Sequence, residues 1–214
     1  MASLPFVSDS AVTQASPRIL VVAALAEEVA YIRGIETLVT GVGKALAAAT
    51  LARRLATEPR PALVINVGTA GTLNPSLSDV HEVDVVTQHD FPYPAIESLV
   101  TSTDVVTPRA FALSGHAPPR PLSVLPSDAH VLATGDTFVA DHDSAARIAA
   151  LGVDLVDMEG YAYAVTCHTF GVAMRCVKVI SDAADPDAAV SWLDTIDGCA
   201  RRLAEWVAES LSTA

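Results

Sequence analysis

Short apolar runs alternate with helix-favouring stretches along most of the chain. The apolar runs predict buried strands at residues 19–25, 37–41, 63–69, 83–87, 130–134, 154–158 and 173–180. The stretches between and after them predict helices at 44–56, 143–151, 160–170 and from 188 or 192 to 211. Strands that alternate with helices indicate a largely parallel sheet covered on both faces. We therefore predict an α/β fold: a three-layer α/β/α single domain with a largely parallel, mixed central sheet over residues 18–214.

Two segments do not follow this alternation. Residues 1–17 are mixed and polar, without the basic start and continuous apolar stretch of a signal peptide, and predict a disordered leader. Residues 90–128 are rich in proline and predict an irregular connection with short strands. Since no run approaches 18 uncharged apolar residues, we expect no membrane span and a cytoplasmic protein.

Composition narrows the classes of ligand. The chain has 214 residues, is 51% hydrophobic, and carries a formal net charge of -12. Such a surface repels phosphate backbones, so we expect neither a nucleic-acid partner nor binding to an anionic membrane. A small neutral or cationic ligand is easier to accommodate. The three cysteines form no CxxC pair, which predicts free thiols in a reducing compartment.

Polar residues gather where the predicted strands end. Open α/β sheets bind ligands outside the carboxyl ends of their strands. Glu27 and Glu28 follow the first strand, a glycine-rich turn at 68–71 follows the third, and residues 157–159 and 181–182 follow two later ones. We expect these residues to converge on one site. The alternative is that the acids are helix caps or solvated first-turn residues.

Familiar cofactor motifs are incomplete. The turns at 41–44 and 68–71 each predict a tight strand-to-helix turn, but Leu46 breaks GxGxxG in the first, and Ala45 after Lys44 excludes a P-loop. The histidines form no HExxH or HxH pair, and the Asp-His-Asp run at 141–143 fits a helix start better than a metal site. GxSxG is absent. We expect no cofactor and no metal.

Four short motifs occur along the chain in an order and spacing that can be compared with known families. They are ALAEEV at 24–29, NVGTAG at 66–71, VDMEG at 156–160 and VISDAAD at 179–185. In this order and spacing they resemble the nucleoside phosphorylase and nucleosidase superfamily, and within it the methylthioadenosine/S-adenosylhomocysteine nucleosidases. The resemblance runs from about residue 19 to 211, except for 90–128. It implies an enzyme that cleaves the N-glycosidic bond of a purine nucleoside.

The resemblance also implies roles at the reacting atoms. Asp182 would protonate N7 of the purine, with Ser181 beside it. Glu28 would hold and activate the attacking water, with the hydroxyl of Thr69 nearby. A protonated and an ionised carboxyl group suit this chemistry, because negative charge develops on the departing base and positive charge on the sugar.

Further residues would bind the substrate. Glu159 would accept hydrogen bonds from the ribose 2′ and 3′ hydroxyls while Met158 packs beneath the sugar. Phe138 would stack on the base, and the backbone of Val139 would read its edge. Ala70 and Gly71 complete the motif that holds Thr69.

Two positions depart from the family pattern. Lys178 stands where an arginine usually orients the water-binding glutamate, and Asp157 stands where a glutamate is common. An ammonium group is not equivalent to the guanidinium fork. The resemblance further implies a homodimer whose partner closes the pocket near Phe91 and Tyr93. Trp192 suits a pocket lid and a core position equally well.

The nucleophile can also be argued from the sequence. Phosphorolysis needs a phosphate cradle, typically with arginines, but neither glycine turn contains one and only Lys44 is basic. We therefore predict hydrolysis, with water as co-substrate and a small-molecule nucleoside as substrate. The alternatives are a phosphate-dependent phosphorylase of the same fold, a catalytically weak nucleoside-binding protein and, last, a nicotinamide-dependent dehydrogenase.

Overall fold

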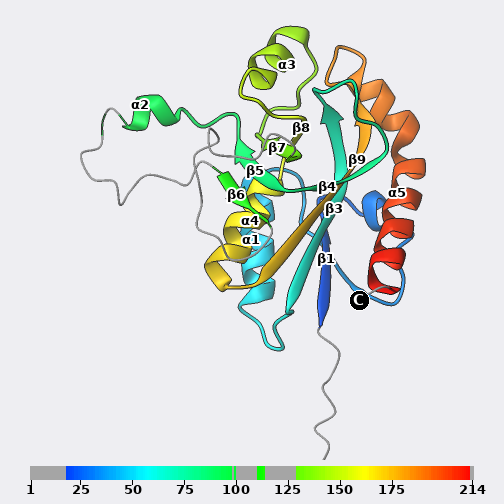
Figure 1. Cartoon of the computed structure of the whole chain (residues 1–214). Helices are drawn as coiled ribbons and strands as arrows, with labels where there is room; N and C mark the ends of the chain where they lie inside the picture. Colours follow the sequence, from blue (N-terminus) through cyan, green and yellow to red (C-terminus); the bar gives the residue numbers. More distant parts are fainter. Residues whose placement is uncertain (1–17, 98, 100–109, 114–128, 213–214) are drawn as a thin grey trace, which may run out of the picture.

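The computed structural model describes residues 18–97, 99, 110–113 and 129–212 (Figure 1). The predicted leader at 1–17 and most of the proline-rich segment at 90–128 lie outside the described residues. Within them, nine strands form one mixed sheet. The strands are β1 (Ile19–Ala23), β2 (Glu36–Val39), β3 (Leu63–Thr72), β4 (Val80–Val83), β5 (Val85–Gln88), β6 (Ala110–Ala112), β7 (Val131–Thr134), β8 (Leu155–Asp157) and β9 (Ala173–Asp182).

Helices cover both faces of this sheet. Figure 1 shows α1 and α4 on one face and α5 on the other. The helical elements are η1 (Glu27–Val29), α1 (Lys44–Leu55), α2 (Tyr93–Glu97), α3 (His142–Ala149), α4 (Gly160–Phe170) and α5 (Ala188–Ser212). The predicted α/β fold with a largely parallel, mixed sheet is therefore confirmed.

The buried side chains of the central strands alternate between the two layers. On β1, Val21 packs with the α5 residue Leu203, whereas Leu20 belongs to the cluster that contains Leu51 of α1. Strands buried on both faces need apolar residues at successive positions, which explains the continuous runs in the sequence. Burial of this kind contributes about 25 cal/mol per Å² of apolar surface, so the two clusters fix the strands that carry the polar residues.

Two local predictions were wrong. The run at 83–87 is not one strand: β4 pairs with β9, and β5 pairs with β7, because the chain changes neighbours at Asp84. The carboxylate of Asp84 accepts a hydrogen bond from the backbone of His130 at 2.8 Å and anchors this change. The glycine-rich stretch at 68–71 is not a turn but the last part of β3, which continues to Thr72.

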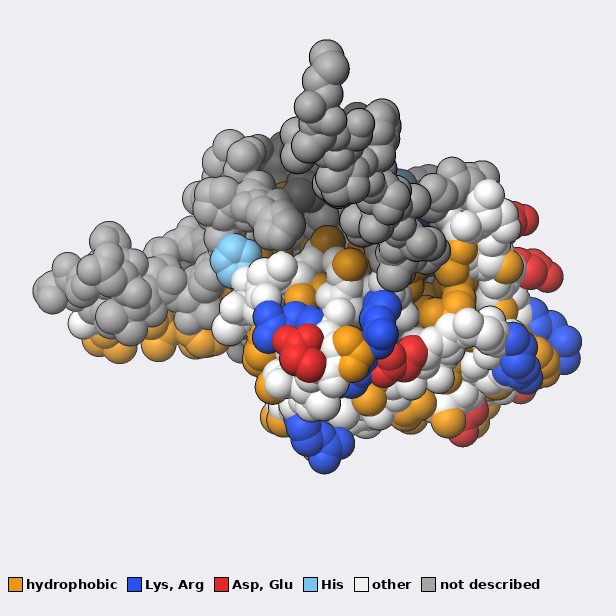
Figure 2. All heavy atoms as spheres, turned by 90° about the horizontal axis from the view of Figure 1, so that it is seen from below, with side chains coloured by type: hydrophobic (Ala, Val, Ile, Leu, Met, Phe, Trp, Pro, Cys, Tyr) orange, Lys and Arg blue, Asp and Glu red, His pale blue; other side chains and the backbone are white. Residues whose placement is uncertain are grey.

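The sheet order places the strand ends together. β3 lies between β1 and β9, parallel to both, so the carboxyl ends of these three strands meet at one edge. The opposite end of the molecule, seen in Figure 2, carries basic and acidic side chains next to one another. Arg54 and Glu36, for example, form an ion pair at 2.6 Å. No helix in the described ranges is long and apolar enough to cross a bilayer.

Candidate active site

A cavity of about 250 Å³ opens at the carboxyl ends of β1, β3, β8 and β9. Of the catalytic and substrate-binding residues that the family resemblance implies, all but Lys178 line it; Lys178 is buried behind the wall. The lining residues are Ala24, Leu25, Glu28, Val42, Thr69, Ala70, Gly71, Thr137, Phe138, Val139, Val156, Asp157, Met158, Glu159, Ser181, Asp182 and Trp192. Segments separated by more than a hundred residues in the sequence thus form one wall.

Glu28 is held in this wall by four hydrogen bonds. Its Oε2 accepts from the backbone N–H groups of Ala24 and Leu25, at 3.1 and 3.0 Å. Its Oε1 accepts from the backbone N–H and the hydroxyl of Thr69, at 2.8 and 3.2 Å. The carboxylate is only 4% exposed, so the alternative of a solvated first-turn glutamate is wrong for Glu28. Glu27, its neighbour, is exposed.

A bulge at the end of β9 orients Asp182. The register shifts so that Ala70 pairs with Ile180 but Gly71 pairs with Asp182. The extra residue, Ser181, donates its hydroxyl proton to Oδ2 of Asp182 at 2.8 Å, and the backbone N–H of Ala184 donates to Oδ1 at 2.9 Å. Bulges near active sites re-aim side chains in this way. Asp182 is not the N-cap of α5, which begins at Ala188.

Glycines in β3 make room for these carboxyl groups. A Cβ atom added at Gly71 would lie 2.7 Å from Oδ1 of Asp182. One added at Gly68 would lie 3.0 Å from Nζ of Lys178 and 3.1 Å from Oε1 of Glu28. The glycines that suggested a turn in the sequence therefore serve close approach of side chains within a strand.

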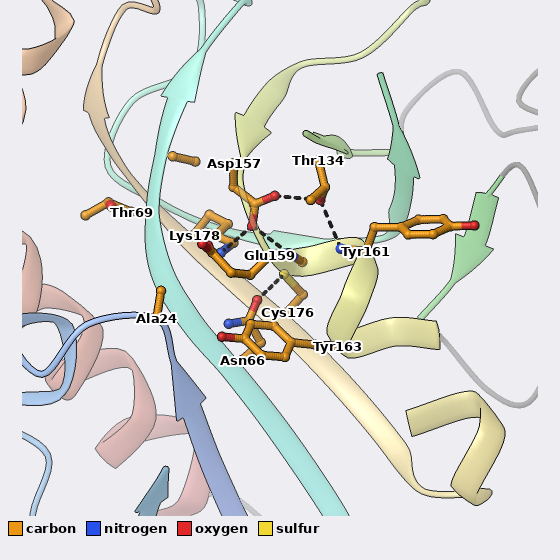
Figure 3. A network of polar contacts seen from close by, with 12 residues as sticks. Ala24, Asn66, Thr69, Thr134, Asp157, Glu159, Tyr161, Tyr163, Cys176 and Lys178 are labelled. Atoms are coloured by element: carbon orange, nitrogen blue, oxygen red, sulfur yellow. Dashed lines mark hydrogen bonds and ion pairs between the residues drawn. The ribbon is translucent and has the colours of Figure 1, made fainter. Parts of the chain in front are cut away.

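Lys178 and Asp157 form a buried ion pair below the cavity, shown in Figure 3. Nζ of Lys178 lies 2.8 Å from Oδ2 of Asp157, which also accepts from the backbone N–H of Gly160 at 2.8 Å. The hydroxyl of Thr134 donates to Oδ1 at 2.6 Å. Burial alone would lower the pKa of Lys178, but the negative charge of Asp157, with further acids nearby, raises it, so the ammonium stays charged. Both carboxylate oxygens of Asp157 have polar partners.

Glu159 is a buried acid whose surroundings change its pKa. Its Oε1 accepts a hydrogen bond from the backbone N–H of Gly43 at 2.7 Å. Burial, followed by repulsion from Asp157, raises the pKa of Glu159 from its ordinary value of 4.5 to about 7, although Lys178 opposes the shift. Glu159 therefore changes its charge near neutral pH.

Two backbone N–H groups of the turn at 41–44 donate to carboxylates. Gly43 has a positive φ of 94° and its N–H binds Glu159, as described above. The N–H of Lys44 donates to Oδ1 of Asp136 at 2.8 Å. The ammonium of Lys44 pairs with Asp90 at 2.5 Å and lies 3.7 Å from Oδ2 of Asp136. Two backbone donors and the cation of this turn are thus bound to acids and not available to a phosphate.

The residues expected to bind the base and the sugar lie on the remaining wall. Val139 is buried, whereas Phe138 is 47% exposed. An exposed aromatic ring in the cavity wall can stack on a bound base. Met158 lines the cavity between Asp157 and Glu159. The Phe91 and Tyr93 rings lie 4.6 Å apart and do not line it.

Among the contributors that sequence reasoning did not assign, three stand out. Gly43 gives a backbone donor to Glu159, and this contact is visible only in three dimensions because the two residues lie 116 positions apart in the sequence. Val42 lines the cavity from the same turn. Trp192 also lines the cavity, so of the two positions left open for it, at the pocket or in the core, the structure shows the first. The sequence signal for Trp192 was an aromatic residue in the first turns of a helix that follows Asp182.

The charge of the cavity lining is one-sided. Its lining contains four carboxyl groups, from Glu28, Asp157, Glu159 and Asp182, and no lysine or arginine among the residues that the structure describes. Such a cavity repels anions and stabilises positive charge that develops inside it.

Asp141, in the Asp-His-Asp run at 141–143, caps α3: its carboxylate accepts a hydrogen bond from the Ser144 N–H at 2.7 Å.

Comparison with known proteins supplies the family. A family model described as "Phosphorylase superfamily" matches residues 33–213. The chain belongs to this superfamily. Within it, the chain is 30% identical over 190 residues to a 5′-methylthioadenosine/S-adenosylhomocysteine nucleosidase of Actinobacillus succinogenes, covering 82% of this chain and 79% of the relative. A relative of the same name from Staphylococcus aureus is 28% identical over 164 residues, covering 72% and 70%.

Solved structures of this superfamily share the fold. The nucleosidase of Neisseria meningitidis in complex with methylthio-immucillin-A matches with a TM-score of 0.76 and 23% identity, over 92% of this chain and all of that one. The futalosine hydrolase of Helicobacter pylori matches with a TM-score of 0.77 and 20% identity, over 92% and 98%. At these identities the likeness establishes the fold.

Proposed function

We propose that this chain hydrolyses the N-glycosidic bond of a purine nucleoside, with 5′-modified adenosines such as methylthioadenosine or S-adenosylhomocysteine as substrates. One observation carries the proposal: Asp182 and Glu28 line the same cavity, and that cavity holds four carboxyl groups without a lysine or arginine among its described lining residues. The curated relatives named for this activity support it.

At the base, Asp182 acts as the general acid. As the C1′–N9 bond breaks, its electron pair moves into the purine ring, and Asp182 gives a proton to N7. The bulge and the donors from Ser181 and Ala184 hold this carboxyl group in one orientation. Transfer from a positioned acid contributes about 10²–10⁴-fold to the rate.

At the sugar, Glu28 holds the water that attacks C1′. The water oxygen forms the new bond to C1′, and one of its protons passes to the carboxylate of Glu28. The sugar carries positive charge during this step, and the acidic lining stabilises that charge. Glu159 accepts hydrogen bonds from the ribose hydroxyls, which orients C1′ between the water and the base.

The base and the lower face of the sugar meet apolar groups. Phe138 stacks on the purine, the backbone of Val139 reads its edge, and Met158 packs under the ribose.

Water is favoured over phosphate as the nucleophile. A phosphate group would meet four acids, and the turn at 41–44 already donates its N–H groups to Glu159 and Asp136. Lys44, its basic residue, is paired with Asp90. Desolvating a phosphate beside carboxylates is costly when the described lining residues include no lysine or arginine to pair with it. In this proposal the enzyme is cytoplasmic, as its sequence predicts, and a homodimer, as its family resemblance implies.

A nucleoside panel tests the proposal. The protein is incubated with methylthioadenosine, S-adenosylhomocysteine, inosine and futalosine, each with and without phosphate, and free base is measured. We expect base from a 5′-modified adenosine at equal rates in both buffers. Release that requires phosphate would assign the chain to the phosphorylases, and binding without release would make it a nucleoside-binding protein.

A further inference from the structure

Trp192 is connected to the proposed water-activating carboxylate through a single hydroxyl group. Its indole N–H donates to Oγ1 of Thr69 at 3.0 Å. The Thr69 hydroxyl in turn donates to Oε1 of Glu28 at 3.2 Å. The three residues come from α5, β3 and η1, and all three line the cavity.

The direction of this hydrogen-bond chain is fixed by its ends. An indole N–H can only donate, and an ionised carboxylate can only accept. The hydroxyl between them must therefore accept from Trp192 and point its own proton at Glu28. Of the four donors to Glu28, the Thr69 hydroxyl is the only one that does not belong to the backbone and can rotate.

The Thr69 hydroxyl can also accept a hydrogen bond from a water. A hydroxyl oxygen has two lone pairs. Trp192 uses one of them, so the second can accept a proton from a water that donates its other proton to Glu28. Without the indole N–H, the hydroxyl could turn, and its proton would then compete with the water.

We propose that Trp192 is a positioning residue for hydrolysis: its indole N–H fixes the rotation of the Thr69 hydroxyl, and the hydroxyl and Glu28 together hold the attacking water. The inference rests on the proposed function and deepens it. This role differs from that of an apolar lid, because a phenyl ring would cover the cavity equally well but has no N–H group to donate.

A double-mutant cycle tests this role. Trp192→Phe, Thr69→Val and the double variant are compared for base release from methylthioadenosine in phosphate-free buffer. Because one neutral hydrogen bond is lost, we expect Trp192→Phe to lower kcat about 3- to 10-fold, with KM changed by no more than about 2-fold. In the Thr69→Val background the same substitution should have no further effect, whereas in Thr69→Ser, which keeps the hydroxyl, its effect should return.

The second tryptophan provides the control. Trp206, also on α5, stacks with the Arg175 guanidinium at 4.5 Å and does not line the cavity. Trp206→Phe should therefore leave kcat unchanged. Since the chain has two tryptophans, this variant also makes Trp192 the single indole fluorophore. Thr69→Val in that background should shift the emission of Trp192, because its N–H loses an acceptor.

The outcomes separate the two ideas. If Trp192→Phe and Thr69→Val lower kcat independently, or if Trp192→Phe changes KM alone, Trp192 only covers the cavity and the inference is overturned. An unchanged emission maximum in Thr69→Val would show that the hydrogen bond is absent and would overturn it as well. A shifted emission together with no base release by the wild-type protein would instead overturn the proposed function, and the positioning role with it.

Discussion

Gly71→Ala is the substitution for which the structure predicts the sharpest loss of activity. The added Cβ would lie 2.7 Å from Oδ1 of Asp182, closer than such atoms approach in folded proteins. It would also lie 3.2 Å from Cγ2 of Val156 and 3.3 Å from Cβ of Ala184, so the new methyl group cannot move away from Asp182 without meeting these atoms. The Asp182 carboxyl group must move.

The size of the effect follows from what holds that carboxyl group. Oδ1 is bound to the Ala184 N–H and Oδ2 to the Ser181 hydroxyl, so a displacement weakens both hydrogen bonds. A misplacement of about 1 Å in a reacting group costs about 10²-fold in rate. Overpacking should also lower the free energy of unfolding by about 1–3 kcal/mol. We therefore expect kcat to fall about 100-fold while the protein remains folded at 25 °C.

The assay is base release from methylthioadenosine in phosphate-free buffer, with thermal unfolding followed in parallel. Gly198→Ala is the matched control, because Gly198 lies within α5 and an added Cβ there meets no atom within 4 Å. Alanine favours helix over glycine by about 1 kcal/mol, so this control should be fully active and slightly more stable. A Gly71→Ala enzyme with wild-type kcat would refute the placement of Asp182 at the reacting base.

Three further predictions follow from the acids of the site. Asp182→Asn should lower turnover by at least about 10²-fold with the protein still folded, since the amide oxygen can accept from Ala184 but the general acid is lost; turnover within a few-fold of wild type would remove Asp182 from this role. Glu159 has a pKa raised from 4.5 to about 7, so its effect on stability is most favourable below pH 4.5 and is lost as pH rises to 7. Relative to Glu159→Gln, the free energy of unfolding of the wild type should fall by about 3 kcal/mol over this range, and denaturation at both pH values measures it. Lys178→Met should destabilise the fold by about 3–5 kcal/mol, because Asp157 is left buried without its counter-charge, and Asp157→Asn in the same chain should recover part of the loss; equal stability of the single and double variants would contradict this.

The sequence predicted the layers of the fold well because the apolar runs reflect burial on both faces. The strands that begin at residues 19, 63 and 173 and the helix at 160–170 occur where they were expected. It failed where the chain changes neighbours without changing its apolar character, as at Asp84 between β4 and β5. The pattern of apolar residues in a strand does not show which other strand pairs with it.

The glycines at 68–71 are a second instructive failure. Glycine usually marks a turn, and the segment was expected to be one. In β3 the same residues make space for the Asp182 carboxyl group and for the Lys178 and Glu28 side chains. The demand for glycine comes from side chains that are 40 to more than 100 residues away in the sequence, and it becomes visible only in three dimensions.

The members of the site were easier to predict than their contacts. Motif order identified the residues that line the cavity, including Glu28 and Asp182. It could not indicate that Glu159 takes its donor from Gly43, or that Trp192 reaches Glu28 through Thr69, because these contacts depend on helix and turn placement.

The most direct measurement of the central claim is the origin of the oxygen atom on the released sugar. Methylthioadenosine is converted in water enriched in oxygen-18, in parallel without and with added phosphate, and the products are identified by mass spectrometry. If Glu28 delivers water to C1′ while Asp182 protonates the base, labelled free sugar and adenine form at the same rate in both reactions. A sugar phosphate formed only when phosphate is added, with no labelled free sugar, would contradict the account.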